Sequence, residues 1–327
     1  MNKIGIIGCG AWGTTISLLF HQNNHRVKIW CHNSEIAELI NTNHECPLLK
    51  GIRLPDSIEA NDSLESIVKT SDFLVLAVAS SYVTILDQIK SLGSKPVLNL
   101  IKGLMENQES FFISDYLKQT CGPLNYALLS GPNLASEIAR KLPSATVISS
   151  ESQNLASQFQ QMLSCESFRI YTSNDLRGVE LGGILKNIMA IAAGVVDGLN
   201  LGNNAKSALM TRGLQEMIRF GVNCYNARKE TFVGLSGLGD LITTCSSDKS
   251  RNWQVGNQLA KGKKLSEIQE NMQAVAEGIK TTKIIYQLAR ENQVEMPITS
   301  QVYQVLYEHL SPPQAIANLM NRDLKSE

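Results

Sequence analysis

The stretch GIIGCGAWGTT, residues 5–15, places Gly8, Gly10 and Gly13 directly after a run of apolar residues. A strand followed by G-x-G-x-x-G and a helix is the fingerprint of a loop that binds the diphosphate of a dinucleotide. The first glycine permits a tight turn, the second lets backbone N–H groups approach the phosphates, and the third lets the helix pack against the strand. A glycine-rich turn without a ligand is the alternative. The order of strand, fingerprint, helix and second strand favours dinucleotide binding.

Short apolar runs recur in the first half of the chain, separated by helical patterns. Runs that are apolar without alternation are typical of strands buried on both faces of a sheet, and strands separated by helices predict parallel βαβ units. We therefore expect an α/β fold that begins with a doubly wound, Rossmann-type sheet. The expected strands are 3–7, 26–30, 72–78, 96–101, 125–129, 145–149 and 168–171.

The second half of the chain changes character, because from about Gly178 onward only helical periodicity is evident. We expect a dinucleotide-binding Rossmann domain at 1–178 and an all-helical C-terminal domain, which binds substrate and carries the catalytic group, at 179–327. A chain of 327 residues is longer than most single cores, which also favours two domains. Helical patterns cover residues 207–224 and 265–289 and resume after Pro297.

Composition limits the classes of partner. Lysine plus arginine and aspartate plus glutamate both number 30, so no global field recruits nucleic acid or anionic lipid, and an anionic substrate needs a local cluster of donors. The apolar stretch 181–202 contains Lys186, Asp197 and repeated glycines, and therefore predicts a buried helix rather than a membrane span. Seven cysteines without a CxxC pair suit a reducing compartment, and no signal-like leader opens the chain, so we expect a cytoplasmic protein.

The end of the second expected strand, IWCHNSE at 29–35, bears on the choice of cofactor. A site specific for NAD usually has an acidic residue here that binds the ribose 2′-hydroxyl. Cys31, His32 and Asn33 stand there instead, so nothing repels a 2′-phosphate and His32 can donate to one. We therefore favour NADP(H) over NAD(H). Glu35 would still reach the ribose if the loop curls back, which leaves NAD(H) open.

Lys186 is the candidate general acid and base. It lies within the apolar stretch 181–202, where loss of hydration would favour release of its proton and suit proton transfer near neutral pH. The structural alternative is a snorkelling or salt-bridged lysine. Asp240, in GLGDL at 237–241, is a candidate to orient Lys186 or a substrate hydroxyl, or else to cap the helix that follows.

Three further fragments contain candidate ligand groups. Lys102 in LIKGL and Gly131 in LLSGPN come just beyond expected strands, at the edge where ligands of open α/β sheets bind. Ser250, Arg251 and Asn252 place a cation beside neutral donors, which suits a phosphate group, although a solvated surface arginine is the alternative. The sequence contains no metal-binding spacing and no GxSxG elbow, so the cofactor and a lysine would have to perform the chemistry.

The motifs occur in one order along nearly the whole chain. They are GCGAWGT at 8–14, LIKGL at 100–104, SGPN at 130–133, LKN at 185–187, NAKSALMTRG at 204–213, GLGDLITTC at 237–245, KSRN at 249–252, AVAEGIKTTK at 274–283 and EMPIT at 295–299. The set closely resembles NAD(P)-dependent glycerol-3-phosphate dehydrogenase of the bacterial, soluble type. The resemblance implies reversible reduction of dihydroxyacetone phosphate to sn-glycerol 3-phosphate for glycerophospholipid synthesis. It also implies a Rossmann domain followed by a helical domain, and a homodimer.

The resemblance further implies roles for individual residues. Lys186 resembles the family's proton donor in reduction and proton acceptor in oxidation. The implied substrate contacts are Lys102, Gly131, Asn133, Lys186, Asp240, Ser250, Arg251 and Asn252. The cofactor contacts, taken together with the glycine loop, are Gly8, Gly10, Ala11, Trp12, Gly13, His32, Lys102, Ala135, Arg251, Val275 and Glu277.

The chain departs from the family's pattern at several positions. Ala11 replaces a hydroxyl-bearing residue, Ala79 stands where proline is usual, Ile101 where threonine is frequent, and Asn133 where threonine or serine is frequent. Two alternatives to the named family remain. An NADP-dependent hydroxyacid dehydrogenase would bind a carboxylate in place of phosphate, and a nucleotide-binding sensor would keep the loop without the chemistry.

Overall fold

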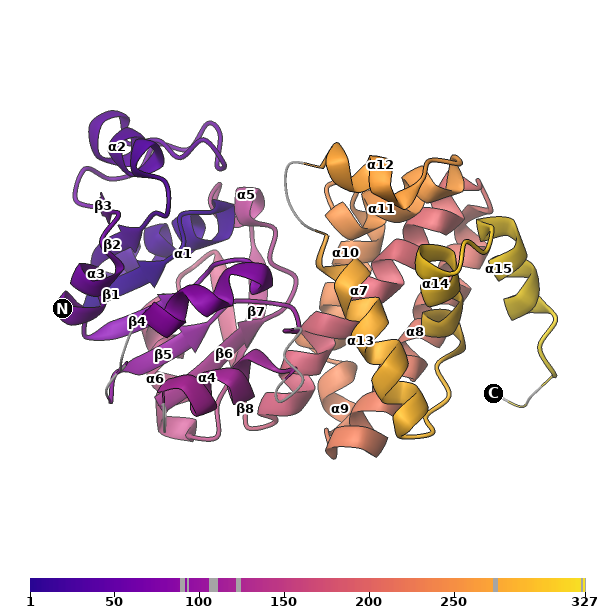
Figure 1. The fold of residues 1–327 in the computed structure, drawn as a ribbon. Helices are drawn as coiled ribbons and strands as arrows, with labels where there is room; N and C mark the ends of the chain where they lie inside the picture. The colour runs from indigo at the N-terminus through magenta and orange to yellow at the C-terminus, as the bar shows by residue number, and fades with distance from the viewer. Residues whose placement is uncertain are drawn as a thin grey trace. The chain divides into compact units, whose positions relative to one another are not determined.

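The computed structural model describes residues 1–88, 92, 94–105, 111–121, 125–272, 276–324 and 326. The chain forms two compact units, Met1–Leu176 and Arg177–Glu327 (Figure 1). Each unit has a buried apolar core. The first unit contains the strands, and in the described part of the second unit all the regular elements are helical.

The first unit is built on an eight-stranded sheet in the order β3-β2-β1-β4-β5-β6-β7-β8. The chain starts at β1 and winds outward in both directions, so the point where the strand order reverses lies between β1 and β4. The doubly wound α/β fold predicted from the sequence is confirmed. The strands are β1 Lys3–Ile7, β2 Arg26–Trp30, β3 Glu59–Asn61, β4 Phe73–Leu76, β5 Pro96–Asn99, β6 Asn125–Ser130, β7 Ser144–Ser149 and β8 Phe168–Ser173.

Helices cover both faces of this sheet. On one face Phe20 and Phe159, from α1 and α6, join the core cluster with Ile4 and Ile6 of β1. On the other face α3 packs so closely on β1 that a Cβ added to Gly5 would lie 2.8 Å from the Ile67 side chain. The sheet therefore needs apolar residues on both faces, as the unbroken apolar runs indicate. The helices are α1 Ala11–Gln22, α2 Ser34–Asn43, α3 Leu64–Thr70, η1 Ser80–Gln88, α4 Ile113–Cys121, α5 Ala135–Ile138 and α6 Gln153–Leu163.

The predicted parallel units account for most of the sheet, and β7 departs from them because it runs antiparallel to β6. The connection between them contains only α5, a helix of four residues that rises about 6 Å. A parallel crossover must return the chain along the full length of a strand, usually with a longer helix. Strand β3 was not among the expected strands, because this three-residue edge strand is too short to give an apolar run.

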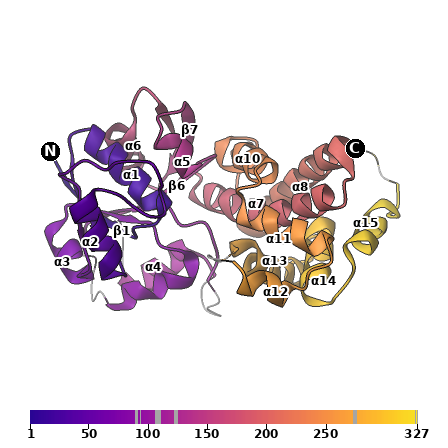
Figure 2. The same cartoon turned by 90° about the horizontal axis from the view of Figure 1, so that it is seen from above.

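The second unit consists of helices packed around α7, which lies among α8, α10, α11 and α13 (Figure 2). The predicted helical region at 265–289 contains two helices, α12 and α13, and residues 273–275 between them lie outside the described part of the chain. The elements are α7 Leu176–Gly198, α8 Gly202–Tyr225, α9 Lys229–Phe232, η2 Leu235–Gly239, α10 Asp240–Ser246, α11 Arg251–Ala260, α12 Leu265–Glu270, α13 Glu277–Glu291, α14 Pro297–Tyr307 and α15 Pro312–Met320.

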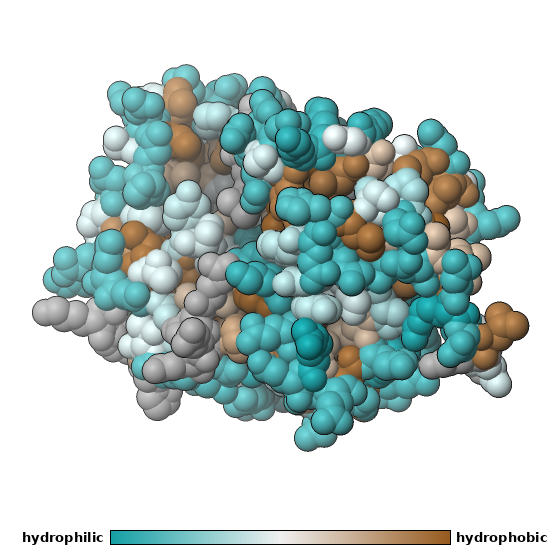
Figure 3. All heavy atoms as spheres, turned by 45° about the vertical axis from the view of Figure 1, so that its right-hand side comes forward, coloured by the Kyte–Doolittle hydropathy of each residue, from teal (hydrophilic) through white to brown (hydrophobic). Residues whose placement is uncertain are grey.

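Helix α7 is long and apolar enough to cross a membrane, yet its whole apolar window is buried inside the protein. The predicted buried helix is therefore confirmed. The face of the molecule shown in Figure 3 is largely hydrophilic, and its apolar side chains gather in small patches. Within α7, every residue from Gly178 to Val196 is buried, as expected of a central helix with neighbours on all sides.

The buried side chain of Glu216, on α8, caps the N-terminus of α14. Its buried carboxylate accepts hydrogen bonds from the backbone N–H groups of Ile298, at 2.5 Å, and Thr299, at 3.1 Å. The Thr299 hydroxyl donates a third bond at 3.1 Å. Burial raises the pKa of Glu216 to about 7, and these hydrogen bonds and the nearby Arg219 offset part of the rise.

We predict that Glu216 makes the free energy of unfolding fall as the pH rises from about 5 to 7. In this range the folded carboxyl holds a proton that the unfolded chain has released, so folding takes up a proton and becomes less favourable as protons become scarce. The slope contributed by one such group is at most about 1.4 kcal/mol per pH unit. Urea unfolding at pH 5, 6 and 7 should show this slope in the parent protein and lose it in Glu216→Gln. The exposed Glu308, at the other end of α14, provides the control Glu308→Gln, and equal slopes in parent and Glu216→Gln would contradict the assignment.

Candidate functional site

The glycine loop has the geometry that its sequence predicts. Gly8 follows β1 with φ +123°, a conformation that favours glycine, and its N–H donates to the carbonyl oxygen of Trp30 at 3.1 Å. A Cβ on Gly13 would lie 2.1 Å from the Gly8 carbonyl oxygen. The first and third glycines are therefore required by the fold itself, because the turn and the first helix pass within contact distance of each other.

Gly10 differs from the other two glycines. A Cβ added there would have no atom of the described part of the chain within 4 Å, and its φ of −68° is open to any residue. Gly10 is the N-cap of α1, where no side chain caps the helix and no acidic residue occupies the first turn, and Ala11 and Trp12 beside it are partly exposed. A helix N-terminus with clear space before it fits a diphosphate, which would take hydrogen bonds from the backbone.

The end of β2 is polar and lacks an acidic residue at positions 30–33. His32 is exposed, and its ring lies 6.0 Å from that of Trp30. Asn33 caps α2 by accepting a hydrogen bond from the N–H of Glu35 at 2.7 Å. Glu35 thus occupies the first turn of α2, with its side chain exposed.

Lys102 and Gly131 meet beyond β5 and β6. The Lys102 ammonium donates to the carbonyl oxygen of Gly131 at 2.8 Å. Asn133 donates through Nδ2 to the hydroxyl of Thr146 at 3.1 Å, whereas its buried Oδ1 has no hydrogen-bond partner among the described residues. Ala135 begins α5, and its carbonyl oxygen accepts from the Thr15 hydroxyl of α1 at 3.2 Å. The first unit therefore places a cation and an unused acceptor at the carboxyl edge of its sheet.

Lys186 is buried in the second unit and has two side-chain partners there. Its ammonium donates to Asp240 Oδ1 at 2.8 Å and to the hydroxyl of Thr244 at 2.7 Å. The Thr244 hydroxyl in turn donates to Asp240 Oδ1 at 3.1 Å. Of the roles considered for Asp240, its carboxylate contacts Lys186 and does not cap α10, whose N-cap is Gly239 without a side-chain cap.

Glycines explain how α7 and its neighbours come close enough to form this cluster. A Cβ on Gly182 of α7 would lie 2.6 Å from the carbonyl oxygen of Ser236, in the single π-helical turn η2 that leads into α10. A Cβ on Gly237 of this turn would lie 2.0 Å from the carbonyl oxygen of Phe232. The backbone contacts leave Asp240 directly opposite Lys186, and π-helical turns are frequent at functional sites.

Asn252 connects three helices next to Lys186. Its Nδ2 donates to Oδ1 of Asn187 on α7 at 2.9 Å, and its Oδ1 accepts from the N–H of Gly278 on α13 at 2.9 Å. Ser250 caps α11 by accepting from the N–H of Trp253 at 3.3 Å. The N-termini of α11 and α13 thus lie side by side, close to the helix that carries Lys186.

The remaining predicted residues of this unit are at those two helix starts. Arg251 is exposed and begins α11, and Glu277 is partly exposed and begins α13. Val275, predicted as a cofactor contact, lies outside the described residues. Sequence reasoning missed Thr244 and Asn187 as partners of the cluster. A signal existed for Thr244, because it lies four residues after Asp240, on the same face of a helix.

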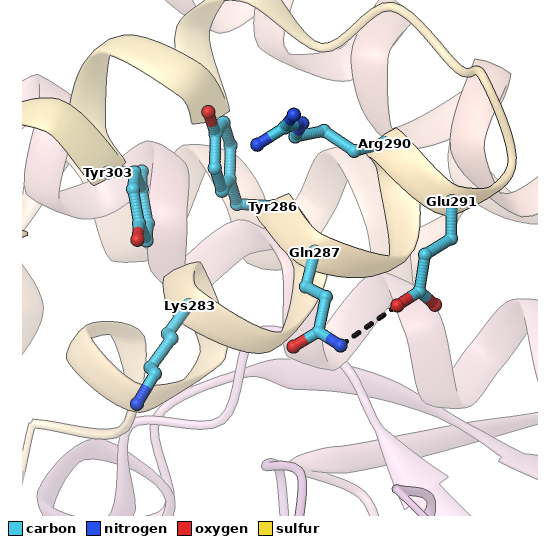
Figure 4. A pocket seen from close by; sticks show the side chains of 6 residues that line it. All are labelled: Lys283, Tyr286, Gln287, Arg290, Glu291 and Tyr303. Atoms are coloured by element: carbon cyan, nitrogen blue, oxygen red, sulfur yellow. Dashed lines mark hydrogen bonds between the residues drawn. The ribbon is translucent and has the colours of Figure 1, made fainter.

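A shallow groove on α13 and α14 involves none of the predicted residues. Figure 4 shows Tyr286 and Tyr303 lying face to face, with ring centroids 3.9 Å apart, and the Arg290 guanidinium near the Tyr286 ring. Gln287 and Glu291 are joined by a hydrogen bond of 2.8 Å. The groove is lined mostly by exposed side chains, and it contains no buried charged group comparable to Lys186.

Comparisons with known proteins connect both units to one enzyme. A family model described as the N-terminus of NAD-dependent glycerol-3-phosphate dehydrogenase matches residues 3–156, and a model of its C-terminus matches residues 175–317. The chain is 42% identical to a glycerol-3-phosphate dehydrogenase [NAD(P)+] of Syntrophotalea carbinolica, over 99% of both chains. It is 41% identical to the enzyme of the same name from Bacillus cytotoxicus, covering all of this chain and 97% of that one.

A solved structure gives the same result. The crystal structure of glycerol-3-phosphate dehydrogenase from Coxiella burnetii superposes with a TM-score of 0.92 at 33% identity. The match covers 98% of this chain and 99% of that chain. The similarity therefore includes the sheet and the helical unit together.

We predict that Gly10→Ala will weaken NADPH binding without destabilising the protein, whereas Gly13→Ala will destabilise the protein. Gly10→Ala should leave the thermal midpoint near that of the parent protein, because the added methyl meets no protein atom. It should raise the dissociation constant of NADPH by about tenfold or more, because the methyl would enter the space before the helix N-terminus. Gly13→Ala should lower the thermal midpoint, because its methyl would collide with the Gly8 carbonyl. Unchanged NADPH affinity in Gly10→Ala, measured by titration of NADPH fluorescence, would show that no diphosphate binds there.

Proposed function

Because the chain belongs to the NAD(P)-dependent glycerol-3-phosphate dehydrogenase family, as its motifs predicted, we propose that Lys186 is the proton donor and acceptor of its reaction. The enzyme is an oxidoreductase that interconverts dihydroxyacetone phosphate and sn-glycerol 3-phosphate. The observation that supports the proposal best is the buried contact of Lys186 with Asp240 and Thr244, at 2.8 and 2.7 Å. When bound, the nicotinamide supplies the hydride for reduction or accepts it in oxidation.

The buried and hydrogen-bonded ammonium of Lys186 supports its proposed role as the general acid. As the ketone is reduced, negative charge develops on the oxygen at C2, and a nearby ammonium both stabilises this charge and delivers the proton. Asp240 and Thr244 fix the Lys186 amine through two hydrogen bonds, so it has little freedom to leave the reacting oxygen. Lys102, held by the Gly131 carbonyl, is the second lysine of the proposal and faces substrate and cofactor.

The phosphate of the substrate binds at the start of α11. Ser250, Arg251 and Asn252 offer a guanidinium and the N-terminus of a helix, which together suit a phosphomonoester. Asn252 is a further substrate contact of the proposal, and hydrogen bonds to Asn187 and Gly278 hold its amide in place. Binding of the remote phosphate then orients the reacting carbon. Gly131, Asn133 and Asp240 complete the substrate contacts, and the cofactor contacts are Gly8, Gly10, Ala11, Trp12, Gly13, His32, Lys102, Ala135, Arg251, Val275 and Glu277.

The proposal extends to the setting of the enzyme. It acts in the cytoplasm as a homodimer, and mainly reduces dihydroxyacetone phosphate to supply the glycerol backbone of phospholipids. The buried position of α7, the balanced charge of the chain and its unpaired cysteines support the cytoplasmic assignment. Sedimentation of the purified protein would test the homodimer directly.

We predict that the enzyme prefers NADPH to NADH. His32 is exposed at the end of β2, where no acidic residue at positions 30–33 repels a 2′-phosphate. Loss of reduced-nicotinamide absorbance with dihydroxyacetone phosphate should therefore be faster with NADPH at equal subsaturating concentrations, and His32→Ala should reduce the ratio of the two rates. His21→Ala, a change of a histidine on α1, is the control. A preference for NADH in the parent protein would overturn the assignment and point to Glu35 as the ribose contact.

We predict that Lys186→Met lowers kcat by about 100-fold or more while leaving the dissociation constant of NADPH nearly unchanged. Methionine keeps much of the volume and removes the proton-transferring amine. Lys206→Met is a matched control, because Lys206 also pairs with a carboxylate in this unit, Asp197, at 2.6 Å. Circular dichroism should show that both variants are folded before rates are compared. Near-normal turnover in folded Lys186→Met would assign the proton to another group.

A further inference from the structure

Three cysteines, Cys9, Cys31 and Cys46, lie in or next to the glycine loop of the first unit. Cys9 lies inside the loop, next to the N-cap of α1, and is partly exposed. Cys31, directly after β2, and Cys46 are both buried in the core cluster against which Cys9 packs. The parallel register pairs Ile7 with Trp30, which brings together the residues that follow β1 and β2. The Cys46 thiol donates to the carbonyl oxygen of Cys9 at 3.4 Å.

Cys9 and Cys31 each adjoin one of two residues in direct contact, because the N–H of Gly8 donates to the carbonyl oxygen of Trp30 at 3.1 Å. The neighbouring Cys31 side chain lowers the pKa of the Cys9 thiol despite its partial burial, and Cys9 together with burial raises the pKa of Cys31. The N-terminus of α1 also favours a thiolate at Cys9. Burial alone raises the pKa of Cys224 in the second unit, so Cys9 has distinct surroundings. Of the two thiols, Cys9 is therefore the better suited to act as a nucleophilic thiolate, and Cys31 is the better suited to stay protonated beside it.

We propose that Cys9 and Cys31 form a reversible redox site at which a hydroperoxide controls dinucleotide binding. The Cys9 thiolate attacks an oxygen of hydrogen peroxide, so that an S–O bond forms, the O–O bond breaks and the departing hydroxide is protonated to water. Cys31 then loses its proton and attacks the Cys9 sulfur, so that the S–S bond forms, the S–O bond breaks and a second water leaves. Two thiols lose two electrons and the peroxide gains them. A dithiol reductant reverses the reaction.

The disulfide would act on the loop that receives the cofactor. Cys9 stands between Gly8 and Gly10, whose backbone geometry sets the position of the N–H groups before α1. Tying Cys9 to Cys31 moves this backbone and thereby weakens binding of the diphosphate, whereas a bound dinucleotide covers the loop and slows oxidation. This consequence rests on the proposed function, while formation of the disulfide does not.

The experiment treats the full-length protein with hydrogen peroxide, blocks remaining thiols with an alkylating reagent and digests with trypsin plus an endoprotease specific for glutamate. Cleavage then places Cys9, Cys31 and Cys46 on separate peptides, which are 4–26, 29–35 and 46–50. Mass spectrometry identifies the linked pair. NADPH fluorescence titration gives the dissociation constant of the reduced, oxidised and dithiothreitol-treated protein. The variants are Cys9→Ala and Cys31→Ala, with Cys224→Ser as the matched control.

We expect a Cys9–Cys31 link that both variants abolish, that Cys224→Ser retains and that prior addition of NADPH slows. Oxidation should raise the dissociation constant of NADPH by about tenfold or more, and dithiothreitol should restore it. A link from Cys9 to Cys46, or Cys9 sulfinic acid without a link, would overturn the assignment. A Cys9–Cys31 link with unchanged NADPH affinity would overturn control of binding. Failure of the reduced protein to bind NADPH would instead contradict the proposed function, and the peptide result would still decide whether the disulfide forms.

Discussion

The burial of one ammonium group, that of Lys186, imposes more on the helical unit than any other single feature. A charged lysine inside an apolar core is costly unless it is paired and hydrogen-bonded, and even a buried pair recovers this cost only when its geometry is good. Asp240 and Thr244 meet the requirement from a single helix, at positions one turn apart. The rest of the unit has to hold that helix in contact with α7.

In both units, glycines let backbone segments come into close contact, and these contacts position the candidate functional groups. In the helical unit, Gly182 and Gly237 let the π-helical turn approach within contact of its neighbours, and this places Asp240. In the sheet unit, Gly8 and Gly13 allow the first turn and the first helix to touch, and this aims the helix N-terminus at open space. Glycine is therefore required by packing at these positions, whereas packing among the described residues does not require it at Gly10.

The sequence predicted those parts of the structure that local patterns determine. Apolar runs located seven of the eight strands, because a strand covered on both faces must be apolar along its length. They did not reveal β3, which is short and at the edge, or the reversal of β7, which depends on how far a four-residue helix can carry the chain. The motif around Asp240 agreed both with a contact to Lys186 or a substrate hydroxyl and with capping of the helix that follows. The structure shows the contact with Lys186.

Contacts between distant segments were beyond reach of the sequence for a physical reason. Asn252 meets Asn187 and Gly278, and Glu216 meets Thr299, only because helices far apart in the chain pack in one particular register. The same holds for Cys9 and Cys31, which look like unrelated core cysteines until the pairing of β1 with β2 brings them together. The loop carries Cys9 between two glycines, and Cys31 follows Trp30, whose carbonyl oxygen this loop contacts. The strand pairing that positions the loop therefore also brings two thiols close to it, and this makes the loop sensitive to oxidation.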